Sequence, residues 1–177
     1  MNGTGVIYDP HGRVLTNAHV VEGAGTVEVA LFGGQVLTAR VLGRSPGPDL
    51  AVLELPAGAY RAAAFGDPWA LRAGDELLVL GHPVGFPFAS EPSAARGILS
   101  KSLRAMDGRY LQTDAPINPG VSGGPVLNSR GEVVGIVEFR YDMLEGRRIQ
   151  GIGFAIPADQ ALATAAALER EEDDTSR

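Results

Sequence analysis

Almost every apolar run in this chain is short and ends at a glycine, a proline or an aspartate. The 177 residues include 24 glycines and 12 prolines, whereas these two residue types together make up roughly 12 % of an average protein. Turn residues this frequent suit short strands rather than long helices. The segment 26–31 (TVEVAL) alternates polar with apolar residues, which is the period of a half-buried strand. The sequence therefore predicts an all-β fold.

The expected strands fall into two groups. The first group comprises residues 5–8, 14–16, 26–31, 36–44 and 50–55, and the second comprises 76–80, 95–103, 110–113, 125–127, 133–138 and 152–156. Two groups of short strands favour two small β-barrels. After Pro157, residues 158–170 are rich in Ala, Leu and Glu and predict a helix.

The boundaries between these groups predict four segments. Residues 1–58 would form an N-terminal β-barrel, 59–74 a connector, 75–157 a C-terminal β-barrel, and 158–177 a C-terminal helix and tail. The first expected strand begins almost at once, and no signal peptide precedes it. We interpret this as a hint that the first barrel is trimmed at its N-terminus.

Charge and composition exclude several classes of function. The formal net charge is −6 and no basic run occurs, so we expect no nucleic-acid partner. The absence of cysteine excludes disulfides, thiolate metal sites and a cysteine nucleophile. The three histidines are too dispersed for a metal site, and we expect no cofactor. No run approaches the ~20 apolar residues of a membrane span, and the composition fits the cytoplasm or, for a trimmed mature domain, export to the periplasm or the extracellular space.

The segment 120–125 (GVSGGP) places a serine between glycines. A serine hydroxyl becomes a useful nucleophile only beside a base, and the attacked carbonyl needs donors for its developing negative charge. Glycines allow unusual backbone angles, so two N–H groups can converge on one point. We therefore expect Ser122 to be a nucleophile and the N–H groups of Gly120 and Ser122 to form an oxyanion hole.

The order of residues along the chain selects among serine hydrolases. The segment also matches G-x-S-x-G, the nucleophile motif of α/β-hydrolases, but in that fold the histidine follows the serine. Here His11, His19 and His82 all precede Ser122. The order His, Asp, Ser of the chymotrypsin type remains open to this chain.

His19 is the expected base. It follows a predicted strand and is surrounded by small residues in the segment 15–21 (LTNAHVV), a setting that holds an imidazole at the edge of a cleft. His11 lies in a Pro-His-Gly turn, and His82 lies in a Gly-His-Pro turn, so we expect both to be turn residues.

Asp49 is the expected third member of the triad, because it lies at the start of the apolar strand 50–55, where it would be partly buried. The competing carboxylates are Asp67, Asp75, Asp107 and Asp114. The first two flank the connector and resemble turn residues, and Asp107 precedes a glycine in a predicted hairpin.

Together these segments resemble the protease domain of the HtrA/Deg family of serine proteases. The matching stretches are residues 3–7, 15–21, 49–55, 74–85, 112–120 and 151–157, in the family's order. The resemblance implies a chymotrypsin-like fold, with two antiparallel β-barrels of the six-stranded type and a C-terminal helix. The chain departs from the family at Val121, where asparagine is usual. It also shows neither a PDZ module nor the N-terminal segment that helps to build trimers, so a homo-oligomer is possible but unsupported.

The resemblance also implies where a substrate side chain would bind. One wall of the pocket would consist of Pro116, Ile117, Asn118 and Pro119, and the opposite wall of Ile136, Val137 and Glu138. The first wall lacks the carboxylate that a preference for Arg or Lys requires, so we expect small or medium aliphatic side chains. A Glu138 side chain that pointed into the pocket would contradict this expected preference for aliphatic side chains. The polar segment 140–150 would be a loop that shapes the pocket.

These features predict a serine endopeptidase that hydrolyses peptide bonds of unfolded or extended proteins through an acyl-enzyme, with the polypeptide bound as an added strand. The alternative is a peptide-binding or chaperone-like module with an inactive or latent protease site. The two differ in the orientation of the peptide group between Pro119 and Gly120. An esterase on the same scaffold is a third hypothesis.

Overall fold

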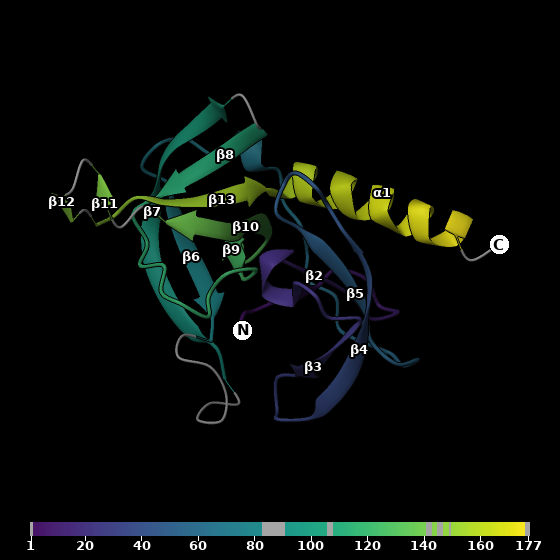
Figure 1. The fold of residues 1–177 in the computed structure, drawn as a ribbon. Coiled ribbons are helices and arrows are strands. Elements are labelled where there is room, and N and C mark those ends of the chain that lie inside the picture. Colours follow the sequence, from purple (N-terminus) through teal and green to yellow (C-terminus); the bar gives the residue numbers. More distant parts are fainter. Residues whose placement is uncertain are drawn as a thin grey trace.

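The computed structural model describes residues 2–82, 91–105, 108–140, 143–144, 147–148 and 150–175. Two β-structured units lie side by side, and one long helix follows them in the chain (Figure 1). The fold is mostly β with a C-terminal helix, as the sequence predicts.

The first unit is an open antiparallel sheet of five strands in the order β1-β2-β5-β4-β3. Its strands are β1 (Val6–Ile7), β2 (Arg13–Thr16), β3 (Thr26–Ala30), β4 (Val36–Arg44) and β5 (Ala51–Glu54). In place of a full six-stranded barrel the structure has a half-barrel, because β1 and β3 are its edges and no sixth strand joins them within the described residues. A local pattern predicts strands one at a time, whereas closure depends on a strand that pairs with both edges.

The second unit is a closed antiparallel barrel of six strands in the order β10-β13-β8-β7-β6-β9. Its strands are β6 (Glu76–Gly81), β7 (Ser93–Ala105), β8 (Gly108–Thr113), β9 (Pro125–Leu127), β10 (Val133–Arg140) and β13 (Gly153–Pro157). Side chains such as Leu77, Val79, Leu99 and Leu111 fill its interior. Closure leaves no free edge, which makes this unit a rigid support for the loop between β8 and β9.

Four short elements were not predicted. The 3-10 helix η1 (His19–Val21) follows β2, and a second one, η2 (Pro68–Ala70), lies in the connector. Strands β11 (Met143–Leu144) and β12 (Arg147–Arg148) pair with each other inside the expected loop 140–150. Residues 141–142, 145–146 and 149 of that loop lie outside the described residues, as do residues 83–85 of the matching stretch 74–85.

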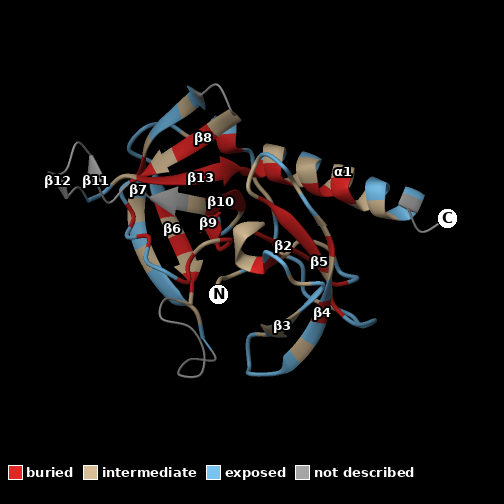
Figure 2. Ribbon diagram, in the orientation of Figure 1, coloured by how far each residue is buried: buried red, intermediate tan, exposed pale blue. Residues whose placement is uncertain are grey.

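The helix α1 (Ala158–Thr175) starts directly after β13 and is longer than predicted. Leu168, Ala161 and Ala165 join a buried cluster that also contains Leu15 of β2 and Ile136 of β10. Figure 2 shows buried residues on β5, on β13 and on the inner side of α1. The helix therefore packs across the junction of the two units and buries apolar surface from both. Among the described residues, none of the helices is long and apolar enough to cross a bilayer.

Two polar clusters add to this packing at the surface. Glu54 of β5 binds Arg13, and it accepts a hydrogen bond from Arg40 Nη2 at 2.9 Å, while Arg40 also pairs with Glu172 of α1. Burial favours a higher pKa for Glu54, but the bonds from the two guanidinium groups outweigh burial and hold the pKa below its ordinary value. The charged Glu54 thus ties three strands to the end of α1.

A second polar cluster joins the connector, β8 and the start of α1. Asp159 accepts hydrogen bonds from Trp69 Nε1 at 3.0 Å and from Arg109 Nη2 at 2.7 Å. The Arg109 guanidinium also lies 4.5 Å from the centre of the Trp69 ring, a cation–π contact. This cluster fixes the connector against the barrel.

We predict that Leu168→Ala lowers the free energy of unfolding by about 2–3 kcal/mol, because the side chain is only 5 % exposed and its removal leaves a cavity between α1 and the first sheet. Chemical denaturation followed by circular dichroism measures this change. Arg170→Ala is the matched control on the exposed side of the same helix, with an expected change within about 0.5 kcal/mol. Equal effects of the two substitutions would contradict the packing of α1.

Candidate active site

His19 begins η1, which follows the end of β2 after Asn17 and Ala18. Its ring Nδ1 lies 2.5 Å from Asp49 Oδ2, and its backbone N–H donates to Asp49 Oδ1 at 3.0 Å. Because an ionised carboxylate only accepts, the neutral imidazole carries its proton on Nδ1 and leaves Nε2 as a base. Both oxygens of one carboxylate are thus used to fix one histidine.

Asp49 is itself held in place by a buried asparagine. It lies just before β5, and its carbonyl oxygen accepts a hydrogen bond from Asn17 Nδ2 at 2.8 Å. Asn17 is completely buried, and its Oδ1 has no hydrogen-bond partner within the described residues. This bond from a buried amide fixes the backbone of Asp49, whose carboxylate orients His19. Asn17 was not predicted as part of the site; its only signal in the sequence is its place between a strand and a candidate base, which does not name its partner.

Ser122 lies in the loop between β8 and β9, which we call the nucleophile loop (residues 114–124). Two hydrogen bonds shape its tip: Val121 N donates to Asn118 O at 3.1 Å, and Gly124 N donates to Val121 O at 2.9 Å. Gly123 N donates to Val137 O of β10 at 3.0 Å and so ties the loop to the barrel. Ser122 is partly exposed between two buried neighbours.

Close backbone contacts join the nucleophile loop to the histidine segment. A Cβ atom on Gly123, whose φ is +82°, would overlap with Thr4 O and with Thr16 Oγ1 and would lie 3.0 Å from Asn17 N. Thr16 and Asn17 are the residues that lead into η1. The structure therefore brings the loop that carries Ser122 against the segment that leads into His19, although the two segments belong to different units.

The competing residues have other partners. Each of three competing carboxylates accepts a hydrogen bond of 2.8 Å from a backbone N–H group. The donor is Trp69 for Asp67 and Arg72 for Asp75. For Asp114 the donor is Ile98. These carboxylates cap turns or fix backbone, and none of the three contacts a histidine within the described residues. Asp107 lies outside the described residues.

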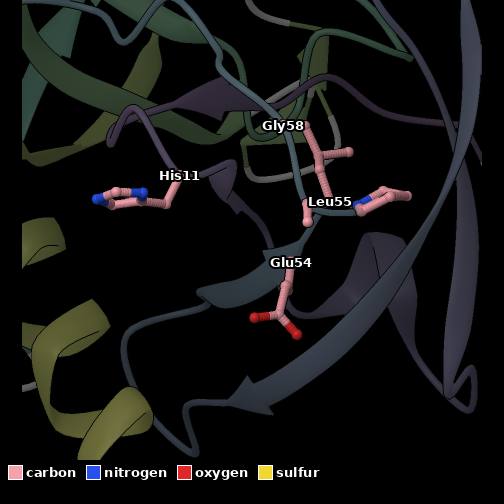
Figure 3. A pocket seen from close by; sticks show the side chains of 6 residues that line it. His11, Glu54, Leu55 and Gly58 are labelled. Atoms are coloured by element: carbon pink, nitrogen blue, oxygen red, sulfur yellow. The ribbon is translucent and has the colours of Figure 1, made fainter.

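Neither of the other two histidines bonds to Asp49 within the described residues. His82 donates its backbone N–H to Thr4 Oγ1 at 3.1 Å. His11 lines a separate hollow of about 460 Å³ together with Glu54, Leu55 and residues 56–58. Figure 3 shows the His11 ring and the Glu54 carboxylate pointing in different directions, and Glu54 is already bound by Arg13 and Arg40. This hollow therefore offers no catalytic pair.

The expected oxyanion-hole donors are the backbone N–H groups of Gly120 and Ser122. Gly120 has a φ of +98°, which favours glycine and turns the backbone of the loop. Within the described residues, neither Gly120 N nor Ser122 N donates a hydrogen bond to another protein group. The role of these two N–H groups as oxyanion-hole donors stays a prediction.

The residues expected around the substrate side chain differ in exposure. Pro116, Asn118 and Pro119 are exposed, Glu138 is partly buried, and Ile117, Ile136 and Val137 are buried. Ile117 and Val137 belong to the core of the barrel, whereas Ile136 belongs to the cluster under α1. Glu138 lies at a register shift between β10 and β13. The role of these seven residues stays a prediction.

No group of three or more potential metal ligands occurs in the part of the chain that the structure describes. The observed chemistry is that of an imidazole fixed by a carboxylate, on a segment that contacts the nucleophile loop. With the hydroxyl of Ser122 and two backbone N–H donors, such a set would activate a hydroxyl and stabilise an oxyanion.

Comparison with known proteins decides the family. The sequence model of the trypsin-like peptidase domain matches residues 3–136. The chain belongs to the trypsin-like peptidase family. Over 171 residues this peptidase domain is 36 % identical to the serine protease Do-like HtrA of Lactobacillus helveticus, a match covering 90 % of the chain and 41 % of that protein. The serine protease Do-like HtrB of Bacillus subtilis is 38 % identical over 156 residues, or 82 % of the chain and 33 % of that protein.

Solved structures give the same answer for the fold. An HtrA-type protease, AlgW with decapeptide, matches with a TM-score of 0.85 and 35 % identity, covering 96 % of this chain and 52 % of that chain. The fold of this peptidase domain is therefore the chymotrypsin-like fold of HtrA-type proteases. The domain spans less than half of the length of the two curated relatives.

We predict that Gly123→Ala lowers the free energy of unfolding by about 3 kcal/mol, since the new methyl group meets Thr4 and Thr16 and the φ of +82° is unfavourable. Gly131→Ala is the matched control, because Gly131 also has a positive φ of +73° but nothing lies within 4 Å of its Cβ position. It should cost only about 1 kcal/mol. Equal losses in chemical denaturation would argue against the close contact between the two segments.

Proposed function

We propose that this chain is a serine endopeptidase with His19, Asp49 and Ser122 as its catalytic triad. The observation that carries the proposal is the double contact of Asp49 with His19, at 2.5 Å to the ring and 3.0 Å to the backbone, beside a nucleophile loop that belongs to the other unit. The serine protease names of the relatives support the same activity. We also keep the four segments 1–58, 59–74, 75–157 and 158–177 as our proposed division of the chain.

Catalysis would begin with attack of Ser122 Oγ on the carbonyl carbon of the scissile peptide bond. His19 Nε2 accepts the hydroxyl proton, and Asp49 stabilises the imidazolium through Nδ1–H. Collapse of the tetrahedral intermediate breaks the C–N bond, and His19 returns the proton to the leaving amine. A water molecule then attacks the acyl-enzyme with His19 again as base, which releases the carboxylic acid and regenerates Ser122.

The N–H groups of Gly120 and Ser122 would bind the oxygen of the tetrahedral intermediate. This role is supported by the lack of another partner for either N–H within the described residues. Stabilising charge that develops in the transition state lowers the barrier more than binding the substrate does.

The substrate would be an unfolded or extended polypeptide. A solved relative is described with a decapeptide bound, and an extended peptide is the form that can add to a strand. The pocket for the side chain before the scissile bond would lie between Pro116, Ile117, Asn118 and Pro119 on one side and Ile136, Val137 and Glu138 on the other. With no carboxylate on the first side, small or medium aliphatic side chains are our proposed preference.

The direct test is incubation of the wild-type chain and Ser122→Ala with unfolded casein, with labelling by a fluorophosphonate in parallel. We predict cleavage and labelling by the wild type, and a loss of kcat on the order of 10⁶-fold in the variant, because the triad acts as a unit. Labelling without cleavage of casein would leave an active serine but remove the proposed substrate class. Neither labelling nor cleavage would favour a peptide-binding module with a latent site.

The role of Asp49 has its own test. Asp49→Asn should lower kcat on the order of 10⁴-fold, since an amide no longer fixes the Nδ1–H tautomer of His19. Asp67→Asn is the matched control, because Asp67 caps η2 through Trp69 N and asparagine is an equally good cap. The kcat of both variants is measured on a peptide substrate. An unchanged kcat in Asp49→Asn would remove Asp49 from the triad.

A further inference from the structure

Thr4 occupies an unusual position between the two units. Its hydroxyl donates to Gly120 O at 2.7 Å, and its backbone N–H donates to Ser122 O at 2.9 Å. The same hydroxyl accepts from His82 N at 3.1 Å, and the Thr4 carbonyl oxygen accepts from Thr16 Oγ1 at 2.7 Å. Four hydrogen bonds therefore fix this one residue, and two of them end on the nucleophile loop.

The two carbonyl groups that Thr4 binds belong to the residues whose N–H groups form the proposed oxyanion hole. We propose that Thr4 is a positioning residue for the oxyanion hole, an inference that rests on the proposed endopeptidase function. A hydrogen bond to the carbonyl oxygen of a residue fixes the peptide plane that follows it, and so limits rotation about the ψ of Gly120 and of Ser122.

Gly120 needs such a restraint more than other residues do. Its φ of +98° lies in a region that glycine enters freely and also leaves freely, since it has no Cβ to limit rotation. The Gly120 N–H belongs to the peptide group between Pro119 and Gly120, and a rotation of that group would leave the triad intact but the hole incomplete. The Thr4 hydroxyl holds the peptide group on the other side of the Gly120 Cα, so the rotation must be taken up at the φ of Gly120 and the ψ of Pro119 alone.

The surroundings of Thr4 suit a rigid anchor. A Cβ on Gly3 would meet the Val20 side chain of η1 at 2.5 Å, and a Cβ on Gly5 would meet Val14 of β2 at 2.8 Å. Segment 3–5 therefore packs closely against η1, which begins with His19, and against β2, which precedes η1. The hydroxyl of Thr4 uses its single proton to donate to Gly120 and one lone pair to accept from His82, and its branched side chain has few rotamers.

The test compares Thr4→Val, which removes the hydroxyl at nearly constant shape, with Thr4→Ser, which keeps it. Removal of an oxyanion-hole donor itself costs about 10²–10³-fold in kcat. We expect Thr4→Val to lower kcat by about ten- to a hundredfold and to leave KM within about twofold, because ground-state binding does not use the hole. Thr4→Ser should recover kcat to within about threefold of the wild type. Thr38→Val, at an exposed position of β4, is the matched control and should retain full activity.

Two further measurements separate positioning from a loss of fold. The affinity of a peptide aldehyde, whose hemiacetal oxygen enters the hole, should fall by the same factor as kcat/KM in Thr4→Val. The amide ¹⁵N shift of Val121, which shares its peptide group with the Gly120 carbonyl, should change in Thr4→Val and return in Thr4→Ser. The chemical shift can be measured whether or not the variant is active, and the same spectrum shows whether the variant is folded.

An active wild type with unchanged kcat in Thr4→Val would overturn the proposal for Thr4 and leave the endopeptidase intact. A Thr4→Ser variant as impaired as Thr4→Val would overturn it as well, because the hydroxyl would then not be the cause. An inactive wild type would instead sink the endopeptidase proposal and with it the catalytic role of Thr4, even where the Val121 shift shows that the hydrogen bond exists.

Discussion

The contact between the nucleophile loop and the residues that end β2 is the interaction on which the candidate site depends. The first sheet supplies His19 and Asp49, and the barrel supplies Ser122, so neither unit holds the chemistry alone. Backbone groups of the two units meet at Gly123, where no side chain fits. Because close-packed backbone has little room to shift, the relative placement of the nucleophile loop and the histidine segment is set by sterics rather than by flexible side chains.

The same junction is supported from the other side by α1. The buried cluster under the helix contains Leu15 of β2, Val52 of β5 and Ile156 of β13, so one apolar core spans both units. Burial of that surface is the main favourable term that holds them together. The charged pairs of Glu54 and Asp159 lie at the surface, where they add orientation more than stability.

Most strands were predictable because alternation and turn residues are local signals. The segments 36–44 and 125–127 match β4 and β9 residue for residue. The half-barrel was not predictable in this way, since closure depends on pairing between distant edges. Thr4 and Asn17 were missed as parts of the site for a similar reason: each is an ordinary polar residue in the sequence, and only the tertiary structure shows that it binds the backbone of the nucleophile loop or of Asp49.

Val121 shows how a departure from the family pattern fits this arrangement. Its side chain is 5 % exposed and packs in the core of the barrel, and a Cβ on Gly81 would lie 2.9 Å from its Cα atom. An apolar residue here anchors the nucleophile loop to the barrel by packing, while Thr4 holds the neighbouring carbonyl groups from the side of the first sheet. Ser122 thus lies between Val121, which packs in the barrel core, and Gly123, which contacts Thr4 and Thr16 of the first unit. Ser122 itself is partly exposed. An apolar residue before the serine is therefore compatible with a fixed loop, because Thr4 restrains the loop through the backbone carbonyl groups of Gly120 and Ser122.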